Sequence, residues 1–263
     1  MTSQDDHQAA VELAEAAGAE LLSLRSRLAE QQTPAAEAKD QGDQASQSLL
    51  MRLLTERFPD DAVLSEEGAD DLARLQSERV WIIDPLDGTR EFSEYERDDW
   101  AVHVALWERG ELTAGAVALP ARGVTYSTAD VSLADPRSSG PIRLAVSRSR
   151  PPEFVNRLAE ALSAELVPMG SAGVKAMSVV AGLSDAYVHA GGQYEWDSAA
   201  PVAVARAAGL HTSRIDGSRL VYNNENPWLP NLLISHTTAA GEILGALADI
   251  AARGASESPK QMN

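Results

Sequence analysis

The stretch "RVWIIDPLDGTREF", residues 79–92, decides both the local fold and the place where chemistry is expected. An apolar run typical of a buried strand leads directly into Asp84 and Asp87. Pro85 lacks an N–H group, so strand pairing is predicted to end there. Gly88 then permits a sharp turn and a close approach of the backbone to a ligand. The stretch therefore predicts a strand, a turn that carries carboxylates, and a helix that begins directly afterwards.

This turn has two interpretations. Asp, Pro and Gly are all common turn residues, so an ordinary turn with a helix cap explains the pattern as well as a functional site does. In the other interpretation, the side chains of Asp84 and Asp87 and the carbonyl group of Leu86 converge on a cation. The free N–H groups of a helix beginning at Thr89 would then point to the same place and bind phosphate. These residues alone leave both interpretations open.

Further carboxylates favour the functional interpretation. Glu66 and Glu67 end the preceding short strand, and Asp197 begins a helix directly after Trp196. Several acids at the ends of buried strands would repel one another unless cations neutralised them. Mg²⁺ prefers such oxygen ligands, and two or three ions would balance the carboxylates and a bound phosphate. The chain has no cysteine, and its five histidines lack ligand spacing, so we interpret three that lie in predicted strands as structural: His103, His189 and His211.

Composition limits the classes of partner. The 263 residues are 44% hydrophobic, enough for one large domain or two modest ones. Lys and Arg number 22 against 39 Asp and Glu, a net charge of −17. This charge argues against a nucleic-acid duplex or an anionic membrane as partner, but permits a phosphorylated small molecule when cations lie between. With no basic signal segment and no apolar run of about 18 residues, we expect a cytoplasmic globular protein.

Apolar periodicity predicts α+β layered architecture in two domains. Pro34 and Gly42 are expected to separate the first two helices, and the turn-rich segment 134–141 marks a domain boundary. We predict an N-terminal α+β domain (1–137), a C-terminal α/β domain (138–253) and a disordered tail (254–263). The expected elements include helices at 8–30, 43–57 and 237–252, a three-stranded antiparallel meander at 100–128, and a strand at 219–223.

Three motifs in order carry a family resemblance: "LSEE" (64–67), "WIIDPLDGT" (81–89) and "WDSAAP" (196–201). They resemble the metal-dependent, lithium-sensitive phosphatase superfamily that includes inositol monophosphatase and fructose-1,6-bisphosphatase. Two further motifs, "VSRSR" (146–150) and "GSAGVKAM" (170–177), resemble CysQ-type 3′(2′),5′-bisphosphate nucleotidases, in particular actinobacterial members. The resemblance implies an inositol monophosphatase-like sandwich with layers in the order αβαβα.

The resemblance also implies a metal centre. Glu66, Asp84 and the carbonyl group of Leu86 would hold one Mg²⁺ ion, and Asp84, Asp87 and Asp197 would hold a second. Glu66 would therefore be both a metal ligand and a catalytic residue.

Further catalytic roles follow from the same resemblance. Thr89 would orient the attacking water and Asp43 would accept its proton. Asp40 is the rival for this role, because Gly42 stands where the family has alanine. The N–H groups of Gly88 and Thr89 would bind the phosphate that is removed.

Several other residues are candidates for substrate binding. Lys175 is the only lysine between residues 40 and 260, and near the start of a helix it could meet a second phosphate; the alternative is a surface lysine. Ser147 and Arg148 are expected to face the nucleotide, although Arg148 could equally be a solvated loop residue. Gly191 and Gly192 would either let the substrate approach closely or form a plain turn.

The resemblance implies removal of the 3′-phosphate of 3′-phosphoadenosine 5′-phosphate (PAP) to give AMP, in sulfur assimilation. Its sulfated form, PAPS, is a second expected substrate, and the family resemblance suggests a homodimer. One alternative is a phosphatase acting on inositol 1-phosphate or fructose 1,6-bisphosphate; another is a non-catalytic sensor of nucleotide or metal. The chain has no P-loop motif for binding NTP phosphates, which disfavours NTP hydrolysis by that route. It also has no Gly-x-Ser-x-Gly motif, which disfavours a hydrolase with a nucleophilic serine.

Overall fold

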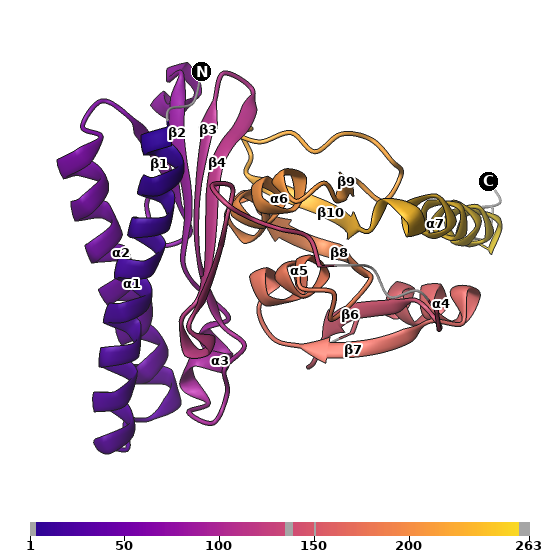
Figure 1. The fold of residues 1–263 in the computed structure, drawn as a ribbon, viewed down its shortest axis with the longest axis horizontal. Coiled ribbons are helices and arrows are strands. Elements are labelled where there is room, and N and C mark those ends of the chain that lie inside the picture. Colours follow the sequence, from indigo (N-terminus) through magenta and orange to yellow (C-terminus); the bar gives the residue numbers. More distant parts are fainter. Residues whose placement is uncertain (1–3, 135–138, 150, 258–263) are drawn as a thin grey trace, which may run out of the picture.

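The structure is a computed structural model that describes residues 4–134, 139–149 and 151–257, folded around two five-stranded mixed sheets (Figure 1). Sheet A has the strand order β1-β2-β3-β4-β5, and sheet B has the order β7-β6-β8-β10-β9. The first part of the chain forms α1 (Gln4–Glu30), α2 (Ala35–Arg57), β1 (Ala62–Ser65), η1 (Leu72–Gln76), β2 (Arg79–Asp87), α3 (Thr89–Ser93), β3 (Ala101–Glu108), β4 (Glu111–Leu119), η2 (Pro120–Arg122) and β5 (Val124–Ser127). The second part forms β6 (Arg143–Ser147), α4 (Glu153–Leu162), β7 (Glu165–Met169), α5 (Ala172–Val180), β8 (Ala186–Tyr194), α6 (Glu195–Ala207), β9 (His211–Ser213), β10 (Trp228–Ser235) and α7 (Thr237–Glu257).

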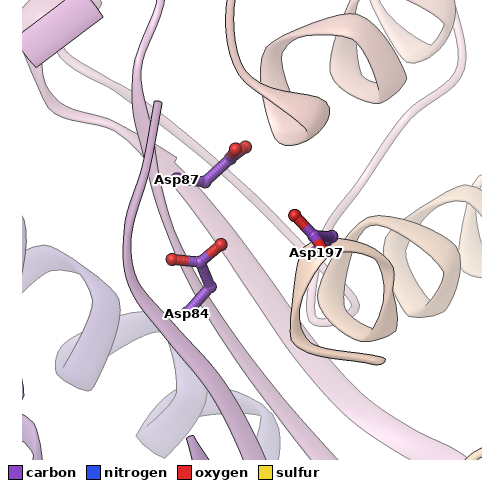
Figure 2. Close-up of side chains that lie close together, drawn as sticks. All are labelled: Asp84, Asp87 and Asp197. Carbon is purple, nitrogen blue, oxygen red and sulfur yellow. The ribbon is translucent and has the colours of Figure 1, made fainter. Parts of the chain in front are cut away.

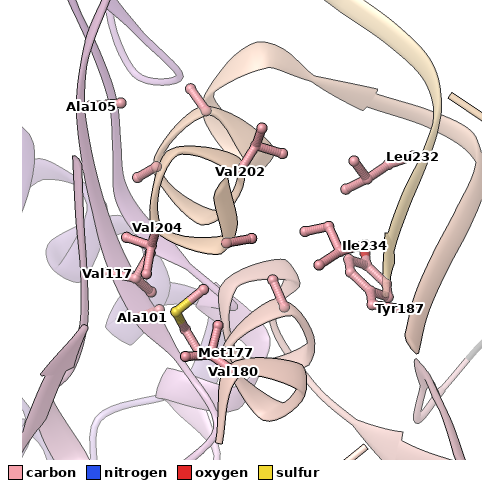
Figure 3. Close-up of a cluster of buried hydrophobic side chains, with 14 of the residues drawn as sticks. Ala101, Ala105, Val117, Met177, Val180, Tyr187, Val202, Val204, Leu232 and Ile234 are labelled. Carbon is pink, nitrogen blue, oxygen red and sulfur yellow. The ribbon is translucent and has the colours of Figure 1, made fainter. Parts of the chain in front are cut away.

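These elements stack in five layers (Figure 1). Helices α1 and α2 cover one face of sheet A, α5 and α6 lie between the sheets, and α4 and α7 cover the far face of sheet B. The central apolar cluster joins Val117 of sheet A, Met177 of α5, Val202 of α6 and Ile234 of sheet B (Figure 3). The layer order αβαβα expected from the sequence is confirmed, as is the antiparallel meander formed by β3, β4 and β5.

A bulge in β2 puts two aspartates on one face of sheet A. Ile82 packs toward α5 and α6, whereas Ile83 packs toward α1 and α2. Regular alternation would place Asp84 and Asp87 on opposite faces, because they are three residues apart. The register against β3 shifts by one residue between them, and Leu86 packs on the α1–α2 side. Both aspartates therefore face the α5–α6 layer.

The prediction that Pro85 ends strand pairing is wrong. Strand β2 continues to Asp87, which is again in register with β3. Pro85 falls in the bulge, and the parallel partner β1 has already ended opposite Ile83, so the missing N–H group costs no ladder hydrogen bond. The Ser46 hydroxyl donates to the Pro85 carbonyl oxygen at 2.6 Å and ties the bulge to α2.

Gly42 does not separate two helices, contrary to the prediction. Helix α2 begins at Ala35, directly after Pro34, and runs through Gly42. A Cβ atom at Gly42 would lie 2.8 Å from both Leu86 Cδ2 and Phe92 Cε1. Glycine is therefore used here for close packing of α2 against the segment that carries the carboxylates.

Gly42→Ala is expected to destabilise the protein by about 1–3 kcal/mol, because the added methyl group overpacks the contact with Leu86 and Phe92. Alanine favours a helix interior by roughly 1 kcal/mol over glycine, so steric strain must exceed that gain. Chemical denaturation measures the change. Gly245→Ala is the matched control, because that exposed position in α7 has no atom within 4 Å of the new methyl group and should gain stability. Equal changes at both positions would contradict the packing argument.

Other predictions about the elements need correction. The predicted strand at 219–223 belongs to neither sheet; Leu220 and Tyr222 are buried, and the Tyr222 hydroxyl lies 3.1 Å from the Ser198 hydroxyl on α6. The alternation of apolar and polar residues in this segment therefore reflects packing on α6 and does not indicate a strand. Helix α7 extends to Glu257, beyond the expected end at 252.

Two further predictions concern parts of the chain with gaps. The predicted tail begins at residue 254, of which residues 254–257 lie in α7 and 258–263 fall outside the described residues. The expected domain division after residue 137 also falls in such a gap (135–138). It stays a prediction, although sheet A comes entirely from before that gap and sheet B entirely from after it. None of the described helices combines the length and apolarity needed to cross a membrane.

Candidate active site

Three carboxylates gather where β2 and α6 meet (Figure 2). One oxygen atom from each of Asp84, Asp87 and Asp197 lies within 4.8 Å of the others. Asp84 and Asp87 are 1% and 7% exposed. The backbone N–H of Tyr194 donates to Asp197 Oδ2 at 2.6 Å, so Asp197 is fixed within the first turn of α6.

Most carboxylates of this cluster bind protons more tightly than usual. Burial raises the pKa of Asp84 well above its ordinary value, and Glu66, Asp87 and Asp197 add to the effect. Burial and then the charge of Asp87 raise the pKa of Asp197 to about 6. Desolvation by surrounding protein atoms, followed by the charge of Asp197, raises the pKa of Glu66 to about 7, although this side chain reaches solvent. The ionised cluster is thus unfavourable by itself, and a divalent cation would remove the repulsion. The donor set fits a hard metal ion.

Asp87 behaves in the opposite way. Burial opposes its charge, but the nearby His103, the charge of Lys175 and the hydrogen bond from Ser171 together outweigh burial and lower the pKa of Asp87. His103 Nε2 lies 3.2 Å from Asp87 Oδ2. The carboxylate also accepts hydrogen bonds from the start of α5, namely from the Ser171 hydroxyl and from the N–H groups of Ala172 (3.0 Å) and Gly173 (2.6 Å).

The interpretation of His103 as a merely structural residue missed its place in the site. His103 is fully buried, and its Nδ1 lies 3.1 Å from the carbonyl oxygen of Trp196, which can only accept a hydrogen bond. Burial disfavours the charged ring, but Asp87, the carbonyl oxygen of Trp196 and Asp197 together outweigh burial and raise the pKa of His103. Gly173 makes room for the ring, because a Cβ atom there would lie 2.1 Å from His103 Nε2. His103 lies beside Asp87 because β3 pairs with β2, and no local sequence motif predicts this contact.

A cleft of about 670 Å³ opens beside these carboxylates. Tyr194 lines it, 46% exposed, and its ring stacks on that of Trp196 with a centroid distance of 4.7 Å. The buried Asp84 does not line the cleft directly. The cleft does bring together eight residues proposed for the site from the sequence: Glu66, Asp87, Gly88, Ser147, Lys175, Gly191, Gly192 and Asp197. His189, which we interpreted as structural, also lines it.

Lys175 is a buried cleft residue, so the surface-lysine alternative is wrong. It is 7% exposed, and its Nζ donates to the carbonyl oxygens of Gly170 (3.3 Å) and Ser171 (2.5 Å). Nζ also lies 5.4 Å from the ring centroid of Tyr187. Burial lowers the pKa of Lys175, while Asp87 and other acids oppose that shift.

Arg148 points to α3 rather than lining the cleft. Its Nη2 donates to Glu91 Oε1 at 2.8 Å and to Glu94 Oε2 at 3.0 Å. Neighbouring Ser147 does line the cleft, so the VSRSR segment contributes one side of it.

Gly191 and Gly192 form a bulge in β8 opposite β10, with φ angles of 129° and 87°. A Cβ atom at Gly192 would lie 2.5 Å from Trp228 Nε1. Both glycines line the cleft, but the close approach seen at Gly192 is to Trp228.

The candidates for water activation are not among the residues that line the cleft. Asp43 and Asp40 share a shallow depression on α2 with Glu67. Burial, followed by the charges of Glu67 and Asp40, raises the pKa of Asp43 to about 7. Thr89 is the first residue of α3, as expected, and is partly buried. The choice between Asp43 and Asp40 stays a prediction.

The pKa shifts predict how pH affects the metal-free protein. A folded-state pKa raised above the unfolded value contributes stability that is lost as pH rises through the folded pKa. Because Asp197 titrates at about 6 and Glu66 at about 7, the Tm of the EDTA-treated protein should fall between roughly pH 5.5 and pH 8. Saturating Mg²⁺ should remove most of this fall. Calorimetry of Asp197→Asn provides the control, since its slope should be shallower; a metal-free Tm that rises across this range would contradict the assignment.

Comparison with known proteins agrees with this geometry. Residues 3–251 match the model of the inositol monophosphatase family. A protein of Mycobacterium tuberculosis named 3′-phosphoadenosine 5′-phosphate phosphatase is 56% identical over 216 residues, 79% of this chain and 81% of the relative. A protein of the same name from Mycobacterium leprae is 48% identical over 257 residues, 93% of this chain and 94% of the relative.

A solved structure supports the same assignment. The crystal structure of CysQ from Bacteroides thetaiotaomicron, described as a bacterial member of the inositol monophosphatase family, superposes with a TM-score of 0.75 at 26% identity. The match covers 89% of this chain and 97% of that one. With the five-layer fold, the carboxylate cluster and these matches together, the chain belongs to the inositol monophosphatase family of metal-dependent phosphatases.

Proposed function

We propose that this protein is a Mg²⁺-dependent phosphatase that removes the 3′-phosphate of PAP to give AMP, and that PAPS is a second substrate. The observation that carries the proposal is one cleft that joins a carboxylate cluster to a buried lysine, Lys175. The names of the two mycobacterial relatives support this choice of substrate. A role in sulfur assimilation, a cytoplasmic location and a homodimer stay predictions.

Metal binding falls to the carboxylate cluster in this proposal. Glu66, Asp84, Asp87 and Asp197 would hold two or three Mg²⁺ ions together with the Leu86 carbonyl group. When bound, the ions would neutralise the carboxylates, polarise the phosphoryl group and lower the pKa of the attacking water. The N–H of Leu86 donates to Asp84 Oδ1 at 3.1 Å and holds that side chain in the bulge.

Other residues of the chain would accept the proton of the attacking water and bind the phosphate. With a pKa of about 7, Asp43 is suited to accept a proton from water at neutral pH. The Thr89 hydroxyl would orient that water, and the N–H groups of Gly88 and Thr89 would bind the phosphate that is removed. Gly88 lines the cleft and has a φ of 88°, which favours glycine.

Two features favour a nucleotide with a second phosphate. Lys175 supplies a buried cation in a chain of net charge −17. Tyr194, which lines the cleft and is supported from behind by the stacked ring of Trp196, offers an aromatic surface on which a base can stack. Ser147, at the end of β6, would contact the nucleotide, and Arg148 would act indirectly by holding α3.

A phosphate-release assay with and without Mg²⁺ tests the proposal. The substrate panel comprises PAP, PAPS, inositol 1-phosphate and fructose 1,6-bisphosphate, and chromatography identifies AMP as the product. We expect the highest kcat/KM for PAP, complete loss with EDTA, and inhibition by Li⁺. A preference for inositol 1-phosphate or fructose 1,6-bisphosphate would support the alternative phosphatase function. No turnover of any substrate would support a sensor.

A further inference from the structure

A buried polar network connects η1 with the segment that precedes β10. Arg74 of η1 is 1% exposed. Its guanidinium donates to both carboxylate oxygens of Asp70 at 2.7 and 2.9 Å. It also donates to Asn223 Oδ1 at 2.5 Å and to the carbonyl oxygen of Asn224 at 2.8 Å. Two segments far apart in the sequence are therefore held together by one side chain.

The network continues to α6 through Glu195, which is fully buried. Its carboxylate accepts hydrogen bonds from Asn223 N (2.6 Å), Asn224 N (2.8 Å) and Asn224 Nδ2 (2.7 Å). Asn223 has a φ of 60°, in the left-handed region, and in this conformation its N–H bonds Glu195 while its side chain bonds Arg74. The chain of contacts therefore runs from Asp70 to the first turn of α6.

Each end of this network lies close in sequence to a candidate metal ligand. Asp70 follows Glu66 by four residues, and Glu195 precedes Asp197 by two. Asp84 and Asp87 share β2, which fixes their separation. Glu66 follows β1, whose last residue Ser65 pairs with Ile83 of β2, whereas Asp197 lies in α6, and no strand pairing joins it to the other three ligands. Burying these charged groups carries a desolvation cost that apolar packing would avoid, so a role in fixing geometry accounts for them better than stability does.

We propose that Arg74, Asn223 and Glu195 form a brace that sets the separation of Glu66 and Asp197, and through it the affinity for metal. They are positioning residues, since their contacts are with each other and with the ligand-bearing segments. The inference rests on the proposed metal-dependent function. It identifies which part of the fold holds Glu66 and Asp197 at the separation that metal binding requires.

Mn²⁺ binding, measured without substrate, tests the brace. The EDTA-treated full chain is titrated with Mn²⁺, and electron paramagnetic resonance reports the free ion. Arg74→Met removes all four hydrogen bonds, and the Mn²⁺ Kd should rise roughly tenfold, the lower end of the loss seen for outer partners of metal ligands. Asn223→Gly keeps the left-handed backbone and removes only the acceptor for Arg74, so a smaller rise is expected.

Arg143→Met is the matched control. Arg143 forms a similar bidentate pair with Asp185 and a hydrogen bond to the Gly182 carbonyl oxygen, outside the cleft. Its loss should lower the Tm but leave the Mn²⁺ Kd unchanged. Near-UV circular dichroism and Tm values accompany each titration, which is run well below the lowest Tm.

Wild-type Mn²⁺ affinity in both Arg74→Met and Asn223→Gly would overturn the brace, even if the Tm falls. An equal rise in Kd for Arg143→Met would also overturn it, because affinity would then follow global stability. If Arg74→Met does not fold, the brace is tested by comparing the Mn²⁺ Kd of Asn223→Gly with that of Arg143→Met. Absence of Mn²⁺ binding in the wild type would overturn both this inference and the metal-dependent function, whereas PAP turnover with unchanged variant affinities would overturn the brace alone.

Discussion

Replacing Asp84 by asparagine is expected to abolish turnover while raising the Tm of the metal-free protein. The raised pKa of Asp84 shows that its charge is unfavourable in the buried cluster, so a neutral side chain of the same shape relieves repulsion from Glu66 and Asp87. The same change removes a proposed ligand of both metal sites. Activity should fall by more than about 100-fold, the upper end of losses for outer partners of metal ligands.

Asp87→Asn is the matched comparison, and its effect on stability should have the opposite sign. Its pKa is lowered, and its carboxylate accepts hydrogen bonds from α5 and faces His103. An amide NH₂ group would face the N–H and O–H groups that now donate to Asp87, so these donors would lose an acceptor. The loss should destabilise the fold by about 1–3 kcal/mol. Activity should again be lost. Calorimetry of both EDTA-treated variants, with PAP turnover in Mg²⁺, measures the contrast; equal Tm changes would show that the two carboxylates do not differ as described.

Lys175→Met is expected to reduce kcat/KM for PAP roughly tenfold to a hundredfold, because a hydrogen bond to a charged group contributes about 1.5–3 kcal/mol. Adenosine 3′-monophosphate, which lacks the second phosphate, should be hydrolysed with little change. Methionine keeps the apolar length of the side chain in its buried position.

The comparison of the two substrates separates recognition from structural damage. Loss of the ammonium group leaves the carbonyl groups of Gly170 and Ser171 without this donor, so some loss of Tm is expected in either case. Equal losses of kcat/KM on both nucleotides would contradict recognition of a second phosphate by Lys175. Loss on PAP alone would locate that phosphate beside α5.

Local sequence was sufficient for the elements around the carboxylates, and the reason is chemical. The apolar run before Asp84 predicts the strand, and Gly88, which tolerates a left-handed backbone, predicts the turn before the helix start; only the strand end inferred from Pro85 was wrong. The identity of α2 as one helix did not follow, because Gly42 is a helix breaker in isolation. Its use becomes clear only from Leu86, 44 positions along the chain.

Long-range pairing explains what the sequence could not show. The face on which Asp87 lies depends on a register shift against β3, and the neighbour of Asp87 is His103 on that same strand. The brace formed by Arg74, Asn223 and Glu195 joins segments about 150 positions apart. Such contacts leave no periodicity or spacing in a single sequence, so only the assembled fold identifies them.

The double use of Asp87 limits how this protein can change its substrate. The carboxylate that faces the metal cluster also caps α5, which carries Lys175. Moving α5 to fit another substrate would therefore disturb the catalytic centre at the same time. We expect variation in specificity, whether natural or engineered, to fall on cleft residues that make no contact with Asp87 and need no special backbone conformation, such as Ser147, Ser149 and Tyr194.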